Sequence, residues 1–249
     1  MAFLKNRRDA GRLLADKLAA RFADQLADQR AARRVATPAG APAAGIVLLA
    51  LPRGGLPVAF EISQRLQLPL EPLVVRKLGV PQYPEFAMGA IAAGGHCMID
   101  RELVRRLRLS DAAVASVIAR ETRELQERAQ QYPTSMPLAS LAGHSVILVD
   151  DGMATGSTML AAIGALRSVG VSAITVAVPV LSREAHDKVA ACVDTVVCLQ
   201  QPEPFHAVGQ CYADFRQVDV DEACALLARA QRLRQAAASA AAGEHIPSH

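Results

Sequence analysis

The sequence has no tryptophan, few other aromatic residues and no long apolar run. Aromatic residues make up 4% of the 249 residues, so alanine, leucine and valine have to fill most of the hydrophobic core. Every apolar stretch is shorter than the ~18 residues that a membrane-spanning helix needs. The stretch 1–22 carries charges throughout and lacks the apolar centre of a signal peptide. We therefore expect a soluble, cytoplasmic protein with no membrane partner.

Cysteine spacing typical of a metal site is also absent. The odd number of cysteines, without a C-x-x-C motif or a metal-type spacing to histidine, is typical of reduced thiols: Cys97, Cys192, Cys198, Cys211 and Cys224. The formal net charge of +3 is too small to indicate nucleic-acid binding by itself. The Arg-rich stretches 30–34 and 101–108 are short and mixed with apolar residues. We therefore expect no nucleic-acid partner.

What the sequence does contain is an alternation of short apolar runs with helical patterns. The runs are typical of strands, several of them buried on both faces, and cover 46–50, 70–78, 87–93, 96–99, 145–149, 173–181 and 194–199. The helical patterns cover 10–34, 58–66, 100–131, 159–169, 183–191 and 219–235, with Ser110-Asp111 and Ser182 as expected N-caps. This alternation predicts an α/β fold, doubly wound, with a mostly parallel sheet and helices on both faces.

Two unusual turns directly follow predicted strands. They are LPRGG at 51–55 and DDGMATGST at 150–158. The carboxyl ends of parallel strands meet at one edge of a sheet, where ligands bind, so we expect both turns there. Between Gly152 and Thr158 the chain has small or hydroxylic residues, with Met153 as the exception, and then a helix begins. Uncovered backbone N–H groups at a helix N-terminus favour phosphate binding, although the lysine of a Walker loop is missing.

The second turn begins with two adjacent carboxylates, Asp150 and Asp151. Two ionised groups about 6 Å apart repel by roughly 3 kcal/mol at an effective dielectric near ~20. A helix N-terminus, a metal or hydrogen-bond donors from a ligand have to offset this repulsion. A sugar phosphate with two neighbouring hydroxyls could bind both features at once: its hydroxyls would donate to the two carboxylates, and its phosphate would bind at the turn 152–158, here called the phosphate turn. An EF-hand is excluded, because its alternating ligands and distal glutamate are missing.

The stretch 146–159, VILVDDGMATGSTM, resembles the ribose-5-phosphate signature of type I phosphoribosyltransferases. A tightly packed loop of small residues and a different phosphate-binding α/β protein are the alternatives. The resemblance covers roughly 46–218 and implies transfer of a 5-phosphoribosyl group from phosphoribosyl diphosphate (PRPP) to a nitrogenous base, with release of diphosphate. It implies that the ribose hydroxyls and the 5-phosphate are bound by Asp150, Asp151, Ala154, Thr155, Gly156, Ser157 and Thr158. Ala154 stands where hypoxanthine and guanine enzymes often have an acid facing the base, so we do not expect that mechanism.

The LPRGG turn resembles the diphosphate loop of the family. The resemblance implies that Arg53 is catalytic and that Gly54 and Gly55 bind PRPP, whereas on its own the turn would be an ordinary strand-to-helix connection. Arg76 and Lys77 precede the loop 79–86, which has two prolines. A mobile loop near this point closes over the diphosphate in the family, which implies a catalytic Lys77 and a PRPP-binding Arg76. The alternative is an exposed basic pair.

The resemblance also implies how the chain is divided. Residues 1–45 would form an N-terminal helix and loop, 46–218 the core, and 219–249 a C-terminal helix with a frayed tail. The core would include a helical insertion at 100–131 and a small hood near 200–218, where Phe205 is the candidate for contact with the base. The roles of the insertion, of Glu85 and of His206 stay open.

The resemblance implies Mg²⁺ as cofactor, bound mainly through the diphosphate of PRPP, and we predict no protein metal ligands. A nucleobase-like acceptor and PRPP are the expected partners, and a homodimer is possible. The alternative from another class is a regulatory protein that senses PRPP with little or no turnover.

Overall fold

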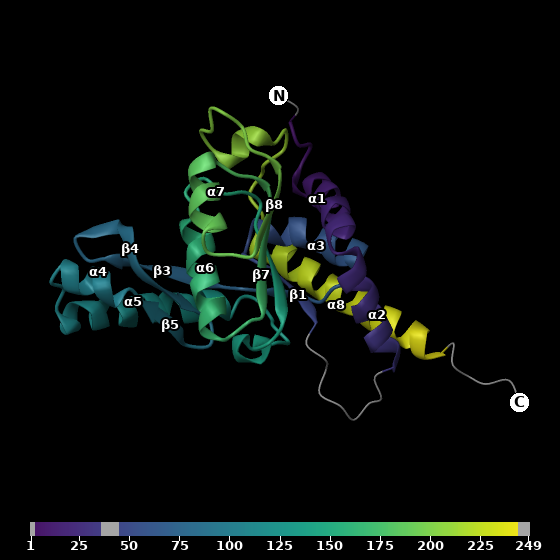
Figure 1. Cartoon of the computed structure of the whole chain (residues 1–249), viewed down its shortest axis with the longest axis horizontal. Helices are drawn as coiled ribbons and strands as arrows, with labels where there is room; N and C mark the ends of the chain where they lie inside the picture. The colour runs from purple at the N-terminus through teal and green to yellow at the C-terminus, as the bar shows by residue number, and fades with distance from the viewer. Residues whose placement is uncertain (1–2, 36–44, 244–249) are drawn as a thin grey trace, which may run out of the picture.

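A five-stranded parallel sheet forms the centre of the computed structural model, which describes residues 3–35 and 45–243 (Figure 1). The strand order is β2-β1-β6-β7-β8. The strands are β1 (Ile46–Ala50), β2 (Leu70–Pro72), β6 (Ser145–Val149), β7 (Ala173–Val180) and β8 (Thr195–Gln200). All four pairings between these neighbours are parallel, which confirms the predicted sheet.

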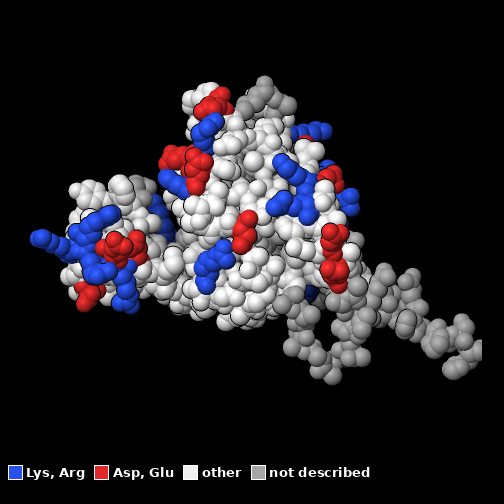
Figure 2. All heavy atoms as spheres, viewed as in Figure 1, with Lys and Arg blue, Asp and Glu red and all other residues white. Residues whose placement is uncertain are grey.

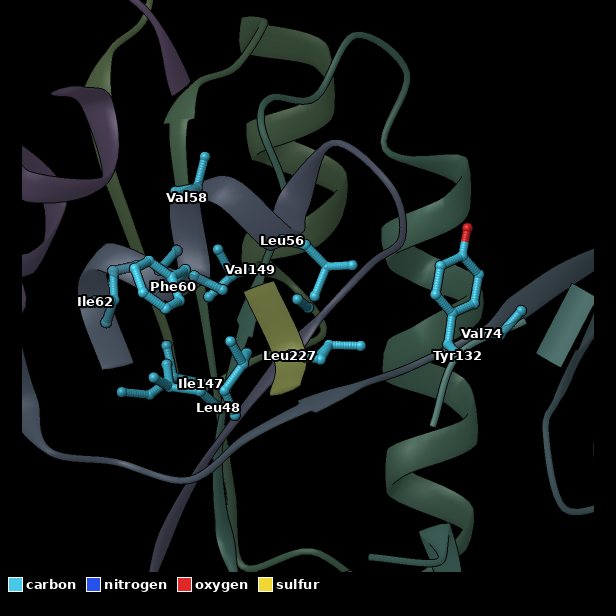
Figure 3. Close-up of a cluster of buried hydrophobic side chains, with 14 of the residues drawn as sticks. Leu48, Leu56, Val58, Phe60, Ile62, Val74, Tyr132, Ile147, Val149 and Leu227 are labelled. Carbon is cyan, nitrogen blue, oxygen red and sulfur yellow. The ribbon is translucent and has the colours of Figure 1, made fainter. Parts of the chain in front are cut away.

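Helices cover both faces of this sheet, as predicted. On one face lie α1 (Arg7–Arg21), α3 (Gly55–Leu66) and α8 (Val220–Gly243), which pack against side chains such as Leu48 and Ile147 (Figure 3). On the other face α6 (Ser157–Ser168) and α7 (Arg183–Ala190) pack against Val47 and Leu148. Successive residues of a strand therefore point into different cores, which explains why these strands are apolar at nearly every position.

A second, antiparallel sheet of β3 (Val75–Val80), β4 (Tyr83–Ala92) and β5 (His96–Ile99) corrects two sequence predictions. The predicted strand 70–78 is two strands, because β2 belongs to the parallel sheet and β3 to the antiparallel one. The predicted loop 79–86 is mostly the end of a β3–β4 hairpin. Pro84 is tolerated there because β5 pairs only with residues 89–92 of β4, so this part of β4 has one neighbour. The register shifts at Gly79, where an added Cβ would lie 2.6 Å from the carbonyl oxygen of Pro84.

The insertion forms two helices, α4 (Arg101–Arg106) and α5 (Asp111–Ala129), that pack with the antiparallel sheet into a separate lobe (Figure 1). Ser110 caps α5 as predicted, since its side chain accepts a hydrogen bond from the Ala113 N–H. Figure 2 shows basic side chains interspersed with acidic ones on this lobe. One side of α5 is buried through Val117, Glu121 and Leu125, so the insertion is not simply a solvated helix pair.

The two ends of the chain differ in part from the prediction. The helix predicted over 10–34 is two helices, α1 and α2 (Ala23–Val35), which meet at Phe22. At the other end α8 extends to Gly243, so the part of the predicted frayed tail up to that residue is helical. Most of the predicted loop 35–45 lies outside the described residues, as do 244–249. No helix in the part of the chain that the structure describes is both long and apolar enough to cross a membrane.

Candidate active site

The two predicted turns pack directly against each other. β6 ends at Val149 and leads into Asp150 and Asp151, while the 51–55 turn leads from β1 into α3. An added Cβ at Gly55 would lie 2.6 Å from the Val149 carbonyl oxygen, and one at Gly54 would overlap the Asp151 carboxylate. Only glycine allows this approach, so the two glycines bring the LPRGG turn onto the acid pair. The expectation that both turns share one sheet edge is confirmed.

The phosphate turn is held in place by its neighbours on β7 and α7. The Met153 N–H donates to the Val180 carbonyl at 2.9 Å, and the Ser182 hydroxyl donates to the Ala154 carbonyl at 2.6 Å. Gly156 has φ of +74° and directly precedes α6, which begins at Ser157. The hydroxyls of Thr155 and Ser157 lie 3.2 Å apart. The turn thus places hydroxyl groups and the first N–H groups of α6 at one point, as an anion site requires.

A cavity of about 630 Å³ lies in front of this turn. Six predicted site residues line it: Arg76, Lys77, Asp150, Thr155, Ser157 and Thr158. The remaining lining residues are Leu51, Pro52, Leu73, Val74, Val75, Arg128, Glu184 and Lys188. Arg128 comes from the insertion helix α5 and Lys188 from α7, and our sequence analysis assigned neither to the site.

Some predicted residues do not line the cavity. Arg53, Gly54, Gly55, Ala154 and Gly156 lie in the two turns beside it, and Asp151 lies behind Asp150. Phe205 is half-buried in a cluster with Leu4, Cys211 and Tyr212, next to α1 rather than in the cavity.

The two carboxylates have different surroundings. Burial raises the pKa of Asp150 well above its ordinary value, and the neighbouring charge of Asp151 raises it further. Burial also raises the pKa of Asp151, but the charge and hydrogen bond of Arg7 act in the opposite direction. The Arg7 Nε donates to Asp151 Oδ2 at 2.7 Å, with side chains 11% and 15% exposed. Of the two carboxylates, Asp150 therefore borders the cavity, and Asp151 is paired with Arg7.

Arg7 is fixed by the segment that follows β8. Its guanidinium donates to the Arg216 carbonyl at 2.8 Å and lies 3.8 Å from the centre of the Phe215 ring. The Tyr212 hydroxyl donates to the carbonyl of Asp151 at 2.6 Å. The backbone of Leu4 pairs with the segment at Cys211 and Ala213. The N-terminal helix and the predicted hood segment therefore meet at the acid pair, an arrangement that no local pattern in the sequence indicates.

The comparisons with known proteins bear directly on this site. Residues 9–216 match the family model of the phosphoribosyl transferase domain, so the match includes most of α1 as well as both turns. The chain belongs to the phosphoribosyltransferase family.

Relatives of this chain cover most of its length. A Mycobacterium tuberculosis protein named "Putative phosphoribosyl transferase Rv0571c" is 40% identical over 232 residues, which is 93% of this chain and 48% of that protein. The chain thus spans about half the length of this relative. The crystal structure of TT1426 from Thermus thermophilus is 38% identical, covers 92% of this chain and 99% of that one, and superposes with a TM-score of 0.75.

Arg76, in the β3–β4 hairpin, pairs with two acidic side chains of α5. Its Nε lies 2.6 Å from Glu121 Oε2, and its guanidinium lies 2.6 Å from a carboxylate oxygen of Glu124. Burial raises the pKa of Glu121, but the hydrogen bonds and charges of Arg76 and Arg120 outweigh burial and leave that pKa lowered. Arg76 borders the cavity, but its charge is already balanced by two carboxylates of the insertion helix.

Proposed function

We propose that this protein transfers a 5-phosphoribosyl group from PRPP to a nitrogenous base and releases diphosphate. One observation carries the proposal: the carboxylate of Asp150 and a turn of hydroxyl residues at the N-terminus of α6 line the same cavity of about 630 Å³. An activity of this kind would serve nucleotide salvage.

The phosphate and ribose would bind at the 150–158 turn. Thr155, Gly156, Ser157 and Thr158 would surround the 5-phosphate, since the hydroxyls and the N-terminus of α6 meet there. Asp150 would accept hydrogen bonds from a ribose hydroxyl, because it borders the cavity. Asp151, which pairs with Arg7 and does not line the cavity, would reach the second hydroxyl only if the turn shifted.

The diphosphate would bind beside Pro52, which also lines the cavity. The backbone of 53–55 and the Arg53 side chain would contact it, and Lys77 would stabilise the negative charge that develops as the bond from the anomeric carbon to the diphosphate breaks. Lys188, one turn along α7 from its partner Glu184, adds a second ammonium group to the cavity. The role of the protein is then to align the acceptor nitrogen with the anomeric carbon and to stabilise the departing charge.

The residues present fit Mg²⁺ that arrives with the substrate. Within the described residues no three His, Cys, Asp or Glu side chains are grouped to hold a metal ion, and the carboxylates lining the cavity are Asp150 and Glu184. When bound, Mg²⁺ would neutralise charge on the diphosphate, and Asp150 and Glu184 are the carboxylates that could contact it from the cavity wall.

The acceptor would lie against the apolar strip formed by Leu73, Val74 and Val75. Phe205, our candidate for stacking on the base, would reach the acceptor only if the segment around it moved, since it packs beside α1 in this structure.

The test is a screen of the purified protein with Mg²⁺ and PRPP against adenine, hypoxanthine, guanine, xanthine, uracil and orotate, following diphosphate release. Release with one base would establish both the activity and the acceptor. Tight PRPP binding in calorimetry without release would instead favour a PRPP-sensing regulatory protein. No binding of PRPP at all would overturn the proposal.

A further inference from the structure

The helical insertion contributes directly to the cavity. Arg128, in the last turn of α5, lines the cavity together with Lys77 and Lys188. Its side chain is exposed, so its charge is available to a ligand that enters from solvent. Its guanidinium donates one hydrogen bond, at 3.2 Å, to the carbonyl of Pro52 in the diphosphate turn. The insertion is thus in contact with the turn that begins α3.

The same helix balances the charge of Arg76. Glu121 and Glu124 lie one to two turns before Arg128 on α5, and both pair with Arg76 at 2.6 Å. An arginine whose charge is balanced by two carboxylates attracts an incoming anion less strongly than one without such partners. On the α5 side of the cavity, the guanidinium that faces the ligand space without a carboxylate partner in the described residues is therefore Arg128.

The charges of Arg128 and Arg53 both influence the same buried side chain, Tyr132. Both act on the buried Tyr132: burial raises the pKa of its hydroxyl, and the charges of Arg128 and then Arg53 lower it. Arg53 follows Pro52 in the chain and Arg128 donates to the Pro52 carbonyl, so these two positively charged residues lie near the same turn and repel each other. A dianionic group bound between them would remove this repulsion and accept hydrogen bonds from both. The position beside Pro52 therefore suits a diphosphate rather than a neutral base.

We propose that Arg128, supplied by the insertion helix, is a diphosphate-binding residue of this site. The inference rests on the proposed function, because it places the diphosphate of PRPP between the 51–55 turn and the end of α5. It gives the insertion a role in substrate binding. Arg76, which we predicted to bind PRPP, also lines the cavity.

The test uses isothermal titration calorimetry with three separate probes: PRPP, diphosphate and ribose 5-phosphate, each with Mg²⁺. The variants are Arg128→Ala and Arg128→Lys. The control is Arg123→Ala, an exposed arginine on the same helix that does not line the cavity. The Arg128→Ala affinity for PRPP and diphosphate should fall by roughly 10- to 100-fold, as for a lost charged hydrogen bond. Ribose 5-phosphate should bind as in the wild type. The affinity of Arg128→Lys should lie between those of the wild-type protein and Arg128→Ala, because lysine keeps the charge but not the planar donor pair.

Two results would overturn the inference while leaving the proposed function intact. One is that Arg128→Ala binds diphosphate with the same affinity as the wild-type protein. The other is an equal loss for ribose 5-phosphate and diphosphate with a lower melting temperature, which would make the Pro52 contact purely structural. Failure of the wild-type protein to bind PRPP would overturn the proposed function and this inference with it. Because binding is measured directly, the outcome does not depend on turnover.

Discussion

Replacing Asp150 by asparagine should stabilise the ligand-free protein and at the same time weaken PRPP binding. Asp150 is partly buried at the edge of the cavity and lies next to a second carboxylate, and both conditions raise its pKa. Asparagine has nearly the same shape and removes the charge. Its Oδ1 can still accept the hydrogen bond that the Asp151 N–H donates to Asp150 at 2.9 Å. The substitution therefore removes an unfavourable charge without removing a backbone contact.

The size of the effect follows from the charge pair. Two carboxylates about 6 Å apart repel by roughly 3 kcal/mol at an effective dielectric near ~20, which is an upper limit because Arg7 balances Asp151. A gain in the free energy of unfolding of about 1–3 kcal/mol corresponds to about 2–10 °C in melting temperature for a protein of this size. PRPP affinity should fall by roughly 10- to 100-fold, because the ribose loses a charged acceptor.

The gain in the free energy of unfolding should also increase as the pH rises. The folded-state pKa of Asp150 is raised above its unfolded value, so the folded protein binds more protons between the two values. Wild-type stability therefore falls as the pH rises from the unfolded pKa through the folded one. The Asp150→Asn variant lacks this group, so its stability does not fall in this way. The difference in the free energy of unfolding between variant and wild type should therefore be small near the unfolded-state pKa of Asp150 and largest above its folded-state pKa.

Thermal and urea unfolding of both proteins between about pH 4.5 and 8.5 would measure the effect, with calorimetric titration of PRPP in parallel. The range avoids acid denaturation, where other carboxylates titrate. A destabilised variant, or a gain that does not vary with pH, would refute the assignment of Asp150 as a partly buried carboxylate with a raised pKa. Unchanged PRPP affinity would refute its role in binding ribose.

Two further predictions concern the surroundings of Asp151. Arg7→Met should lower the free energy of unfolding at neutral pH by about 3–5 kcal/mol, because it leaves a buried carboxylate without its partner. The loss should shrink at acid pH as Asp151 becomes protonated, and urea denaturation at two pH values would show whether it does. Gly54→Ala should weaken PRPP binding, because the added Cβ would overlap the Asp151 carboxylate and displace it. Calorimetry against the wild type measures this, and unchanged affinity would mean that the turn can shift without cost.

The parts of the fold that could be predicted from sequence are those set by short-range patterns. The strand 145–149 and the turn after it are adjacent in the chain, so an apolar run, two acids and a glycine-rich turn indicate the same site from one stretch. Ser110 and Ser182 were identifiable as N-caps because a cap contacts the backbone three residues on. The hairpin at 79–86 was mistaken for a loop because its prolines usually interrupt strands, and sequence alone does not show that this part of β4 is unpaired on one side.

The residues that complete the site could not be predicted, because their partners are distant in the chain. Arg7 is 144 residues from Asp151, and Arg128 is 76 residues from Pro52. Neither arginine stands in a motif, and α1 has the composition of an ordinary surface helix. The ion pairs of Arg76 were missed for the same reason, since its partners Glu121 and Glu124 lie in an insertion whose packing no local pattern reveals.

The pairing of Leu4 with residues 211–213, and of Arg7 with Arg216, has a consequence for how the protein is made. Arg7 and Arg216 are separated by 209 residues, so Asp151 acquires its full surroundings only after almost the whole described chain has been synthesised. The parallel sheet can begin to form on the ribosome earlier, since domains fold from the N-terminus as they emerge. During that interval the acid pair exists without its guanidinium partner. A substrate that binds only the complete site would then stabilise completed chains and not partly synthesised ones.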